Sequence, residues 1–287
     1  MAITTTPALP VSLAGRVPGL RRLRGHSGVT WVAAVWVLLL LLAAVAPGLL
    51  ASDDPTRLRP SLVLMPPGEG VFGTDQYGRD LYTLMVHGTR SALLIGVCST
   101  VLGLVVGSAI GLVAGYAGGW VDMLVGRLLD VLMAFPGILT ALLIAASLGP
   151  STRNLVLAVG LALVPVFARV ARGQVMVIRS RLFVEAARSN GFSAFRILWR
   201  HVLPNSLAPV VVLGTINVGT SIVLAASLSF LGLGPRNEVP DWGQVLSTGQ
   251  PYMATAWWIT TIAGLVLTLT VIAISLLGDS LRDRLEV

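Results

Sequence analysis

Long stretches without a charged residue dominate this chain of 287 residues and limit its possible folds. Charge-free windows cover 25–52, 91–121, 131–152, 154–168, 201–235 and 242–278. A helix needs about 20 apolar residues to cross the ~30 Å hydrocarbon core of a bilayer. The window at 154–168 is shorter, but it continues past Arg169 and Arg172, whose side chains can reach the headgroups by snorkelling. The sequence therefore predicts an all-α integral membrane protein with six transmembrane helices.

The composition supports this class and excludes one kind of enzyme. Hydrophobic residues make up 55% of the chain and charged residues 11%, whereas an ordinary soluble domain has about 25% charged residues. All 20 basic residues are arginine, so the chain has no lysine for a G-x-x-x-x-G-K-[ST] loop. We therefore expect no nucleotide hydrolysis by this route.

The remaining polar residues indicate no reaction centre. The 3 histidines are scattered, the single cysteine Cys98 lies inside an apolar run, and no serine stands in a G-x-S-x-G setting. The net charge of +7 comes from arginines dispersed between apolar blocks, without the interleaved aromatic residues of a nucleic-acid surface. We expect a non-catalytic chain that binds membrane lipid, no nucleic acid, no metal and no cofactor of its own.

The first apolar window follows a cluster of arginines, as in a signal peptide, but it predicts a permanent anchor. Its apolar run exceeds the 7–15 residues of a typical signal core, and no small-x-small cleavage site follows. We expect an uncleaved membrane helix at 29–51.

Orientation follows from the distribution of arginine, because cytoplasmic loops carry an excess of positive residues. With the N-terminus inside, the outer segments hold only Arg57, Arg59, Arg79, Arg90, Arg153 and Arg236. The predicted parts are a cytoplasmic tail 1–28, the anchor 29–51, an extracytoplasmic segment 52–87, a five-helix core 88–278 with a cytoplasmic loop 179–204, and a cytoplasmic tail 279–287. Both termini are then cytoplasmic.

Glycines and prolines inside the apolar windows predict how the helices pack. Of the 31 glycines, most lie in these windows, as in GLVVGSAIGLVAGYAGG at 103–119. Small residues let helix backbones approach closely in a bilayer. Prolines at 136, 165 and 209 free backbone groups and predict bends.

A basic segment, RSRLFVEAARSNGFSAFRILWRHVLPN at 179–205, separates two apolar windows. We expect a helix over 180–190, where Arg181 and Glu185 share one face. Gly191 suits the left-handed position that ends a helix. Small alanines beside a carboxylate suit docking into a partner's groove.

A second short helix is expected to follow in the same segment. It would run from a Ser193 cap to His201, with Phe195, Leu198 and Trp199 on its apolar side. Pro204 then opens the next span and prevents easy continuation of the short helix. A loop that only fixes membrane topology is the alternative, since basic inner loops are routine.

The spacing within this segment resembles a known family. EAARSNG and, after nine residues, HVLP are similar to the E-A-A-x-x-x-G…I-x-L-P loop of ABC importer permeases, with His201 in place of isoleucine. The peptide branch of that family often has R-H-x-L-P-N, and this chain has RHVLPN. Further similar stretches are FGTDQYGRDLYTLMVHGTRSALLIG at 72–96, AGYAGGWVDMLVGRLLDVLMAFP at 114–136, SLSFLGLG at 227–234 and LLGDSLRD at 276–283. Together they resemble the second permease subunit of the dipeptide, oligopeptide and nickel class, although the first fifty residues match only in layout.

The resemblance implies an importer-type ABC permease fold in the bacterial cytoplasmic membrane, with this chain forming half of a translocation pathway. Its partners would be a second homologous permease, two cytoplasmic ATPase subunits that use ATP and Mg²⁺, and an extracytoplasmic substrate-binding protein. The motif positions imply that Glu185, Ala186, Ala187 and Gly191 form the ATPase-coupling helix and its bend. Leu203 and Pro204 would return the chain to the membrane.

The substrate remains open at this stage. Short peptides are the first expectation, nickel or another small solute such as glutathione is the alternative, and a non-transporting membrane scaffold is the alternative from another class. The pathway residues are not identified by the sequence.

Two other charged clusters are expected to be structural. In LVGRLLD, Arg127 and Asp130 can pair on one helical face, close to Asp122, with a functional role as the alternative if these charges lie within the bilayer. In FGTDQYGRD, Asp75 and Arg79 suggest a self-satisfied turn, with contact to the external binding protein as the alternative.

Overall fold

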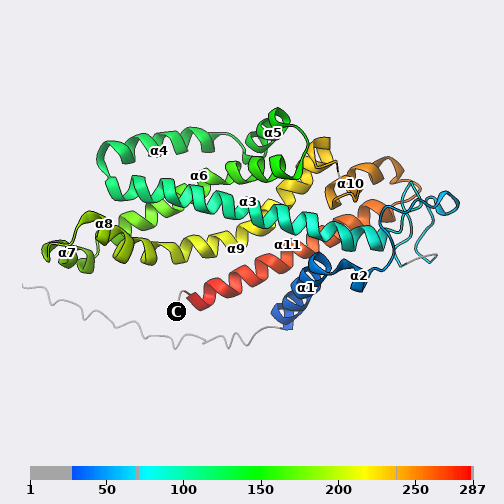
Figure 1. Ribbon diagram of the computed structural model, residues 1–287, viewed down its shortest axis with the longest axis horizontal. Helices are drawn as coiled ribbons and strands as arrows, with labels where there is room; N and C mark the ends of the chain where they lie inside the picture. Colours follow the sequence, from blue (N-terminus) through cyan, green and yellow to red (C-terminus); the bar gives the residue numbers. More distant parts are fainter. Residues whose placement is uncertain (1–27, 69–70, 237, 286–287) are drawn as a thin grey trace, which may run out of the picture.

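The computed structural model describes residues 28–68, 71–236 and 238–285, and Figure 1 shows that these form a helical bundle. Its elements are α1 (Gly28–Val45), α2 (Pro47–Leu50), η1 (Pro60–Leu62), α3 (Leu81–Ala117), α4 (Gly119–Ala134), α5 (Gly137–Leu148), α6 (Thr152–Arg179), α7 (Leu182–Ser189), α8 (Ala194–Ile197), η2 (Leu198–Val202), α9 (Leu203–Leu228), η3 (Ser229–Leu233), α10 (Trp242–Gly249), η4 (Gln250–Tyr252) and α11 (Trp258–Leu285). No strand occurs in the described ranges, where the only strand-like pairing is an isolated bridge between Thr74 and Asp80. The all-α prediction is confirmed.

Within the described ranges, five helices are long and apolar enough to cross a bilayer, and a bent pair can supply a sixth span. The five are α1, α3, α6, the helical run Ala194–Leu233 that contains α9, and α11. The short apolar window before Arg169 belongs to α6, a continuous helix of 28 residues. Six spans agree with the prediction when α4 and α5 count as one.

The third span differs from its prediction. Instead of one helix over 131–152, α4 and α5 meet at an angle of 87°. Phe135 adopts an extended backbone before Pro136, because the proline ring disfavours helical geometry in the preceding residue. As a result α4 packs along α3 and α6 and brings three charged side chains with it (Figure 1).

The last span also starts and ends later than the window 242–278. The first part of this window forms α10 and η4, which lie with residues 52–68 and 71–80 at one end of the bundle (Figure 1). Trp242 is buried there and its indole N–H donates to the Met85 carbonyl at 3.0 Å. The apolar residues of α10 therefore serve its packing on α3 and α11. Helix α11 forms the last span and extends into the predicted tail 279–287.

Glycines on α3 bring its backbone against that of α6. Gly103, Gly107, Gly111 and Gly115 repeat every four residues on the buried face of α3. A Cβ at Gly107 would lie 2.7 Å from the Val164 carbonyl oxygen, and one at Gly111 would lie 2.4 Å from that of Ala168. The predicted role of these glycines in close packing is confirmed.

The turn before α3 satisfies its own charges. Asp75 is buried, and its carboxylate accepts from the backbone N–H of Tyr77 and Arg79 at 2.9 Å. The Arg79 guanidinium donates to the same carboxylate at 2.7 Å. Asp80 caps α3 by accepting from the Thr83 N–H at 2.8 Å. These contacts confirm that the motif forms a self-satisfied turn.

The predicted tail 1–28, except for Gly28, lies outside the described residues, together with Arg16, Arg21, Arg22 and Arg24.

Candidate functional site

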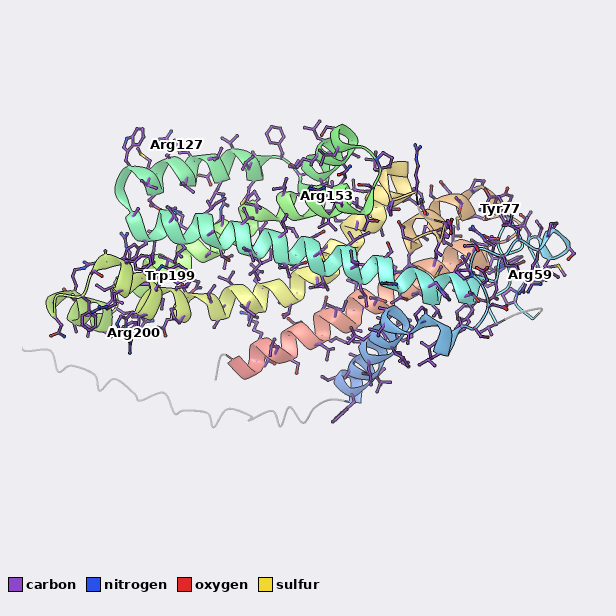
Figure 2. All side chains as sticks on the ribbon, viewed as in Figure 1. Arg59, Tyr77, Arg127, Arg153, Trp199 and Arg200 are labelled. Atoms are coloured by element: carbon purple, nitrogen blue, oxygen red, sulfur yellow. The ribbon has the colours of Figure 1, made fainter. Side chains whose placement is uncertain are left out.

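The segment between α6 and α9 folds into a compact module at one end of the bundle. Figure 1 shows α7 and α8 at the end opposite α10, and Figure 2 places Trp199 and Arg200 there, far from Arg59 and Tyr77. We call residues 179–204 the joint. The predicted order of a helix, a glycine bend and a second short helix is confirmed.

The bend at Gly191 is a complete helix-ending motif. Gly191 has φ of 76°, which lies in the left-handed region that favours glycine. Its N–H donates to the Arg188 carbonyl at 3.0 Å, and the Phe192 N–H donates to the Ala187 carbonyl at 3.2 Å. These are the paired bonds of a Schellman motif, so the reversal after α7 is held by backbone hydrogen bonds.

The second half of the joint differs from the expected stop at Pro204. From Ala194 the chain remains helical into α9, through a π-helical turn at Leu198–Val202. In this turn the Leu203 N–H donates to the Leu198 carbonyl, one residue further back than in an α-helix. The widening comes directly before Pro204, whose ring would clash with the Arg200 carbonyl in a regular helix.

The π turn also changes which side chains are buried. Ile197 and Val202 are almost fully buried and Leu198 is partly buried, whereas Phe195 is 71% and Trp199 is 54% exposed. Phe195 and Trp199 share one side of the helix as expected, with ring centroids 5.9 Å apart, but this side is exposed and only Leu198 of the three packs against the buried cluster. Periodicity alone could not assign the face, because the extra residue of the π turn shifts the register of the helix.

A hydrophobic cluster fastens the joint to the bundle. Val184 of α7, Ile197 and Val202 pack with Val175 of α6, and Tyr116 at the end of α3 lies against them. All four valine and isoleucine side chains are no more than 1% exposed. Burying such a side chain contributes about 1.5–3 kcal/mol, so the joint is a packed part of the fold.

Two hydrogen-bonding residues reinforce this attachment. The Tyr116 hydroxyl donates to the Ala194 carbonyl at 2.8 Å. The Arg179 guanidinium donates to the carbonyls of Gly115 and Tyr116, at 2.8 and 3.2 Å. The end of α3, the end of α6 and α8 are therefore tied together, and a displacement of the joint reaches both long helices.

The outward side of α7 carries an uncommitted acid. Glu185 is exposed, and its carboxylate makes no hydrogen bond or ion pair with any residue in the described ranges, although Arg181 is one helical turn away. Ala186 is exposed beside it, whereas Ala187 is only 6% exposed and packs inward. Leu182 is 82% exposed on the same short helix. The result is a small, partly apolar surface with one free carboxylate.

Leu203 and Pro204 lie in the first turn of α9, where the joint becomes the next span. Leu203 is half-buried and Pro204 is exposed.

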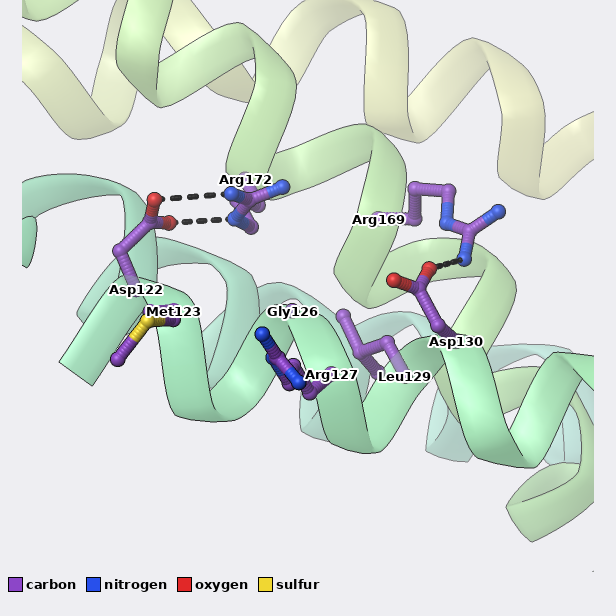
Figure 3. Close-up of a pocket in the computed structure, with 8 residues that line it drawn as sticks. All are labelled: Asp122, Met123, Gly126, Arg127, Leu129, Asp130, Arg169 and Arg172. Atoms are coloured by element: carbon purple, nitrogen blue, oxygen red, sulfur yellow. Dashed lines mark hydrogen bonds and ion pairs between the residues drawn. The ribbon is translucent and has the colours of Figure 1, made fainter. Parts of the chain in front are cut away.

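A second group of charged residues joins α4 to α6 (Figure 3). The Asp122 carboxylate receives two hydrogen bonds from Arg172, one of them at 2.8 Å, and Asp130 pairs with Arg169. The predicted pair between Arg127 and Asp130 is therefore wrong. Residues on α6 provide better-placed partners. Spacing within one helix cannot identify them.

Sequence reasoning missed several residues that hold the joint. Arg179 was counted only among the basic residues, and Tyr116 carried no signal because its partner lies 78 positions away. Ile197 and Val202 are β-branched residues suited to burial. Predicting that both face the bundle requires knowledge of the π turn, which the sequence does not reveal.

The apolar spans and the close glycine packing of α3 on α6 agree with the expected importer-type permease fold. Residues 107–286 match the family model described as "Binding-protein-dependent transport system inner membrane component". The chain belongs to this family, whose members are the membrane-spanning subunits of ABC importers. It is therefore a membrane protein that works with an ATPase and a substrate-binding protein.

Named relatives cover most of the chain. It is 40% identical to the dipeptide transport system permease protein DppC of Alkalihalophilus pseudofirmus, over 86% of this chain and 81% of that protein. It is 38% identical to the di/tripeptide permease DppC of Pseudomonas aeruginosa, over 88% and 86%. It is 40% identical to the glutathione permease GsiD of Escherichia coli, over 92% and 87%.

A solved structure supports the fold alone. The inward-facing methionine ABC transporter MetNI superposes with a TM-score of 0.57 at 19% identity, covering 70% of this chain and 96% of that chain.

Proposed function

We propose that this chain is the permease subunit of an importer for short peptides in the bacterial cytoplasmic membrane. It forms half of the translocation pathway and transmits the movements of the ATPases through the joint. In this proposal it acts without catalysis of its own, beside a second homologous permease, two ATPases that use ATP and Mg²⁺, and an extracytoplasmic binding protein. Both of its termini lie on the cytoplasmic side.

The observation that carries the coupling role is the combination of a firmly attached joint and an unpaired outward acid. A rigid helix seated in a partner's groove transmits force, whereas a loose loop does not. The buried cluster under α7 and the hydrogen bonds of Tyr116 and Arg179 supply rigidity. Glu185 and Ala186 supply an outward face without internal partners.

The substrate class follows from the named relatives. Relatives at similar identity carry names for dipeptide, di/tripeptide and glutathione transport, and glutathione is itself a tripeptide. The feature they share is a short peptide backbone with free carboxylates. This supports short peptides over nickel and over a scaffold without transport.

Two substitutions test the joint in proteoliposomes that contain the whole importer. Gly191→Pro cannot adopt φ of 76°, because proline fixes φ near −65°, and Glu185→Arg reverses the free charge. We expect both variants to reach the membrane and to hydrolyse ATP, with peptide uptake per ATP reduced at least about tenfold. Such a loss corresponds to about 1.4 kcal/mol of coupling.

Matched variants separate coupling from folding. Gly191→Ala meets no atom within 4 Å and adds only backbone strain, so it should fall between the wild type and Gly191→Pro. Glu185→Gln removes the charge without reversing it. If Glu185→Arg and Gly191→Pro both keep the wild-type ratio of uptake to ATP hydrolysis, the joint does not couple peptide uptake to ATP hydrolysis.

A further inference from the structure

The cavity between α4 and α6 contains a positive charge that the fold itself does not use. Its lining includes Asp122, Arg127, Asp130, Arg169 and Arg172, and its volume is about 190 Å³. The two aspartates pair with the arginines of α6. The Arg127 guanidinium makes no hydrogen bond or ion pair with any residue that the structure describes, and Figure 3 shows Arg127 on α4 between the two pairs.

The position of this cavity along α6 places it within the span. Arg172 and Arg169 precede the end of the helix at Arg179 by seven and ten residues. At 1.5 Å per residue these distances are about 10 and 15 Å. The helix of 28 residues is about 42 Å long and exceeds a hydrocarbon core of about 30 Å, so the cavity lies in the half of the span nearest the joint.

The exposed charges around this cavity are unsuited to contact with lipid tails. The side chains of Arg169 and Asp130 are 45% and 72% exposed on the outside of this chain. Charged groups at membrane depth face protein or a water-filled cavity, because contact with hydrocarbon is costly. This face of α4 and α6 therefore suits contact with another protein subunit or with water.

Gly126 lies one helical turn from both aspartates on the lining of the cavity. Because glycine has no side chain, the space beside it is open. A Cβ at this position would be 3.6 Å from the Arg172 Nη2 atom, in ordinary contact. A larger side chain would occupy the space over the guanidinium. The glycine thus leaves room for a small group beside three guanidiniums and two carboxylates, which together retain one positive charge.

We propose that this cavity binds the terminal carboxylate of the transported peptide, with Arg127 as its principal ligand. The inference rests on the proposed function and adds a specific site to it. A guanidinium forms strong paired hydrogen bonds with a carboxylate. Every peptide with a free C-terminus has this group whatever its side chains, so a site that reads it suits an importer of many short peptides.

Direct binding to the solubilised importer without its binding protein tests this assignment. The probe is radiolabelled Ala-Ala, with unlabelled Ala-Ala and its C-terminal amide as competitors. We expect Ala-Ala to bind the wild type, the amide to compete poorly, and Arg127→Gln to bind Ala-Ala at least about tenfold more weakly. Gly126→Leu should produce a similar loss by filling the cavity, whereas Gly126→Ala should bind almost normally.

Arg153→Gln is the matched control, because Arg153 is an exposed arginine at the opposite end of α6. Thermal unfolding of each variant checks that both ion pairs remain. Equal affinity in the wild type and Arg127→Gln, or equal competition by the amide, would overturn the site. Loss of bound phosphatidylglycerol in native mass spectra of Arg127→Gln, without a change in peptide affinity, would assign the cavity to lipid instead.

Uptake measurements keep this result separate from the proposed function. Wild-type proteoliposomes that import Ala-Ala with the binding protein, but show no peptide binding at this cavity, contradict only the cavity. Wild-type proteoliposomes that import no peptide contradict the proposed function itself.

Discussion

Helix α6 packs against α3 on one side and against α4 on the other, and the two contacts are built differently. On the α3 side, glycines bring the two backbones into direct contact over Gly103–Gly111. On the α4 side, two ion pairs bridge the helices and a cavity of about 190 Å³ remains. Only Leu129 of α4 is buried.

This difference separates a fixed part of the permease from an adjustable one. Close-packed backbones resist any displacement, because even a small shift creates overlap. Ion pairs on long side chains tolerate a change in helix separation by rotamer changes. We therefore expect α3 and α6 to move as one body with the joint, and α4 to move relative to them.

The largest predicted effect breaks the seam between α3 and α6. A Cβ at Gly111 would lie 2.4 Å from the Ala168 carbonyl oxygen and 2.7 Å from the Arg172 nitrogen, so Gly111→Leu must push the backbones apart. Overpacking of this kind costs about 3 kcal/mol. Thermal unfolding in detergent should show a strongly lowered Tm, together with aggregation on size-exclusion chromatography.

Gly173→Leu is the control for that change, because Gly173 is on α6 with no atom within 4 Å of the added Cβ. It should unfold almost like the wild type. A Gly111→Leu variant as stable as Gly173→Leu would show that the two helices are not held in backbone contact.

A smaller effect is expected at the more enclosed ion pair. Arg172→Gln leaves the Asp122 carboxylate unpaired with its side chain 18% exposed, at a cost of about 1–3 kcal/mol. Adding Asp122→Asn should recover most of the lost stability, since neither charge is then left alone. A double-mutant cycle on the free energy of unfolding measures the coupling, and a cycle without coupling energy would refute the pairing.

The smallest effect is expected at the outer pair. Arg169→Gln frees Asp130, whose side chain is already 72% exposed, and an exposed pair contributes about 0–1 kcal/mol. Its effect on unfolding should shrink further at high salt, whereas the Arg172 variant should respond less. If Arg169→Gln proves more destabilising than Arg172→Gln, Asp130 does not face water.

Sequence reasoning succeeded for features set by neighbouring residues and failed for contacts between distant helices. The left-handed bend at Gly191 depends on residues within one turn, and it was predicted correctly. The partner of Asp130 depends on which helix lies beside α4, and the prediction chose Arg127 on the same helix in place of Arg169. Spacing along one helix cannot report a neighbour that is 39 positions away.

The joint shows both outcomes within one segment. Its two helices and the position of Glu185 follow from local residue types. The burial of Val202 does not, because the π turn at Leu198–Val202 changes the register of the helix before Pro204.

The sequence by itself determined that this chain is a helical membrane protein, because uncharged windows of about 20 residues leave a bilayer as the stable environment. It also determined the glycine repeat and the motif spacing that mark the family. The tertiary structure alone decided that α4 turns back on the bundle, that its aspartates meet Arg169 and Arg172, and that Arg127 is left over. Those features depend on the packing of distant helices, and such contacts exist only once the bundle has closed.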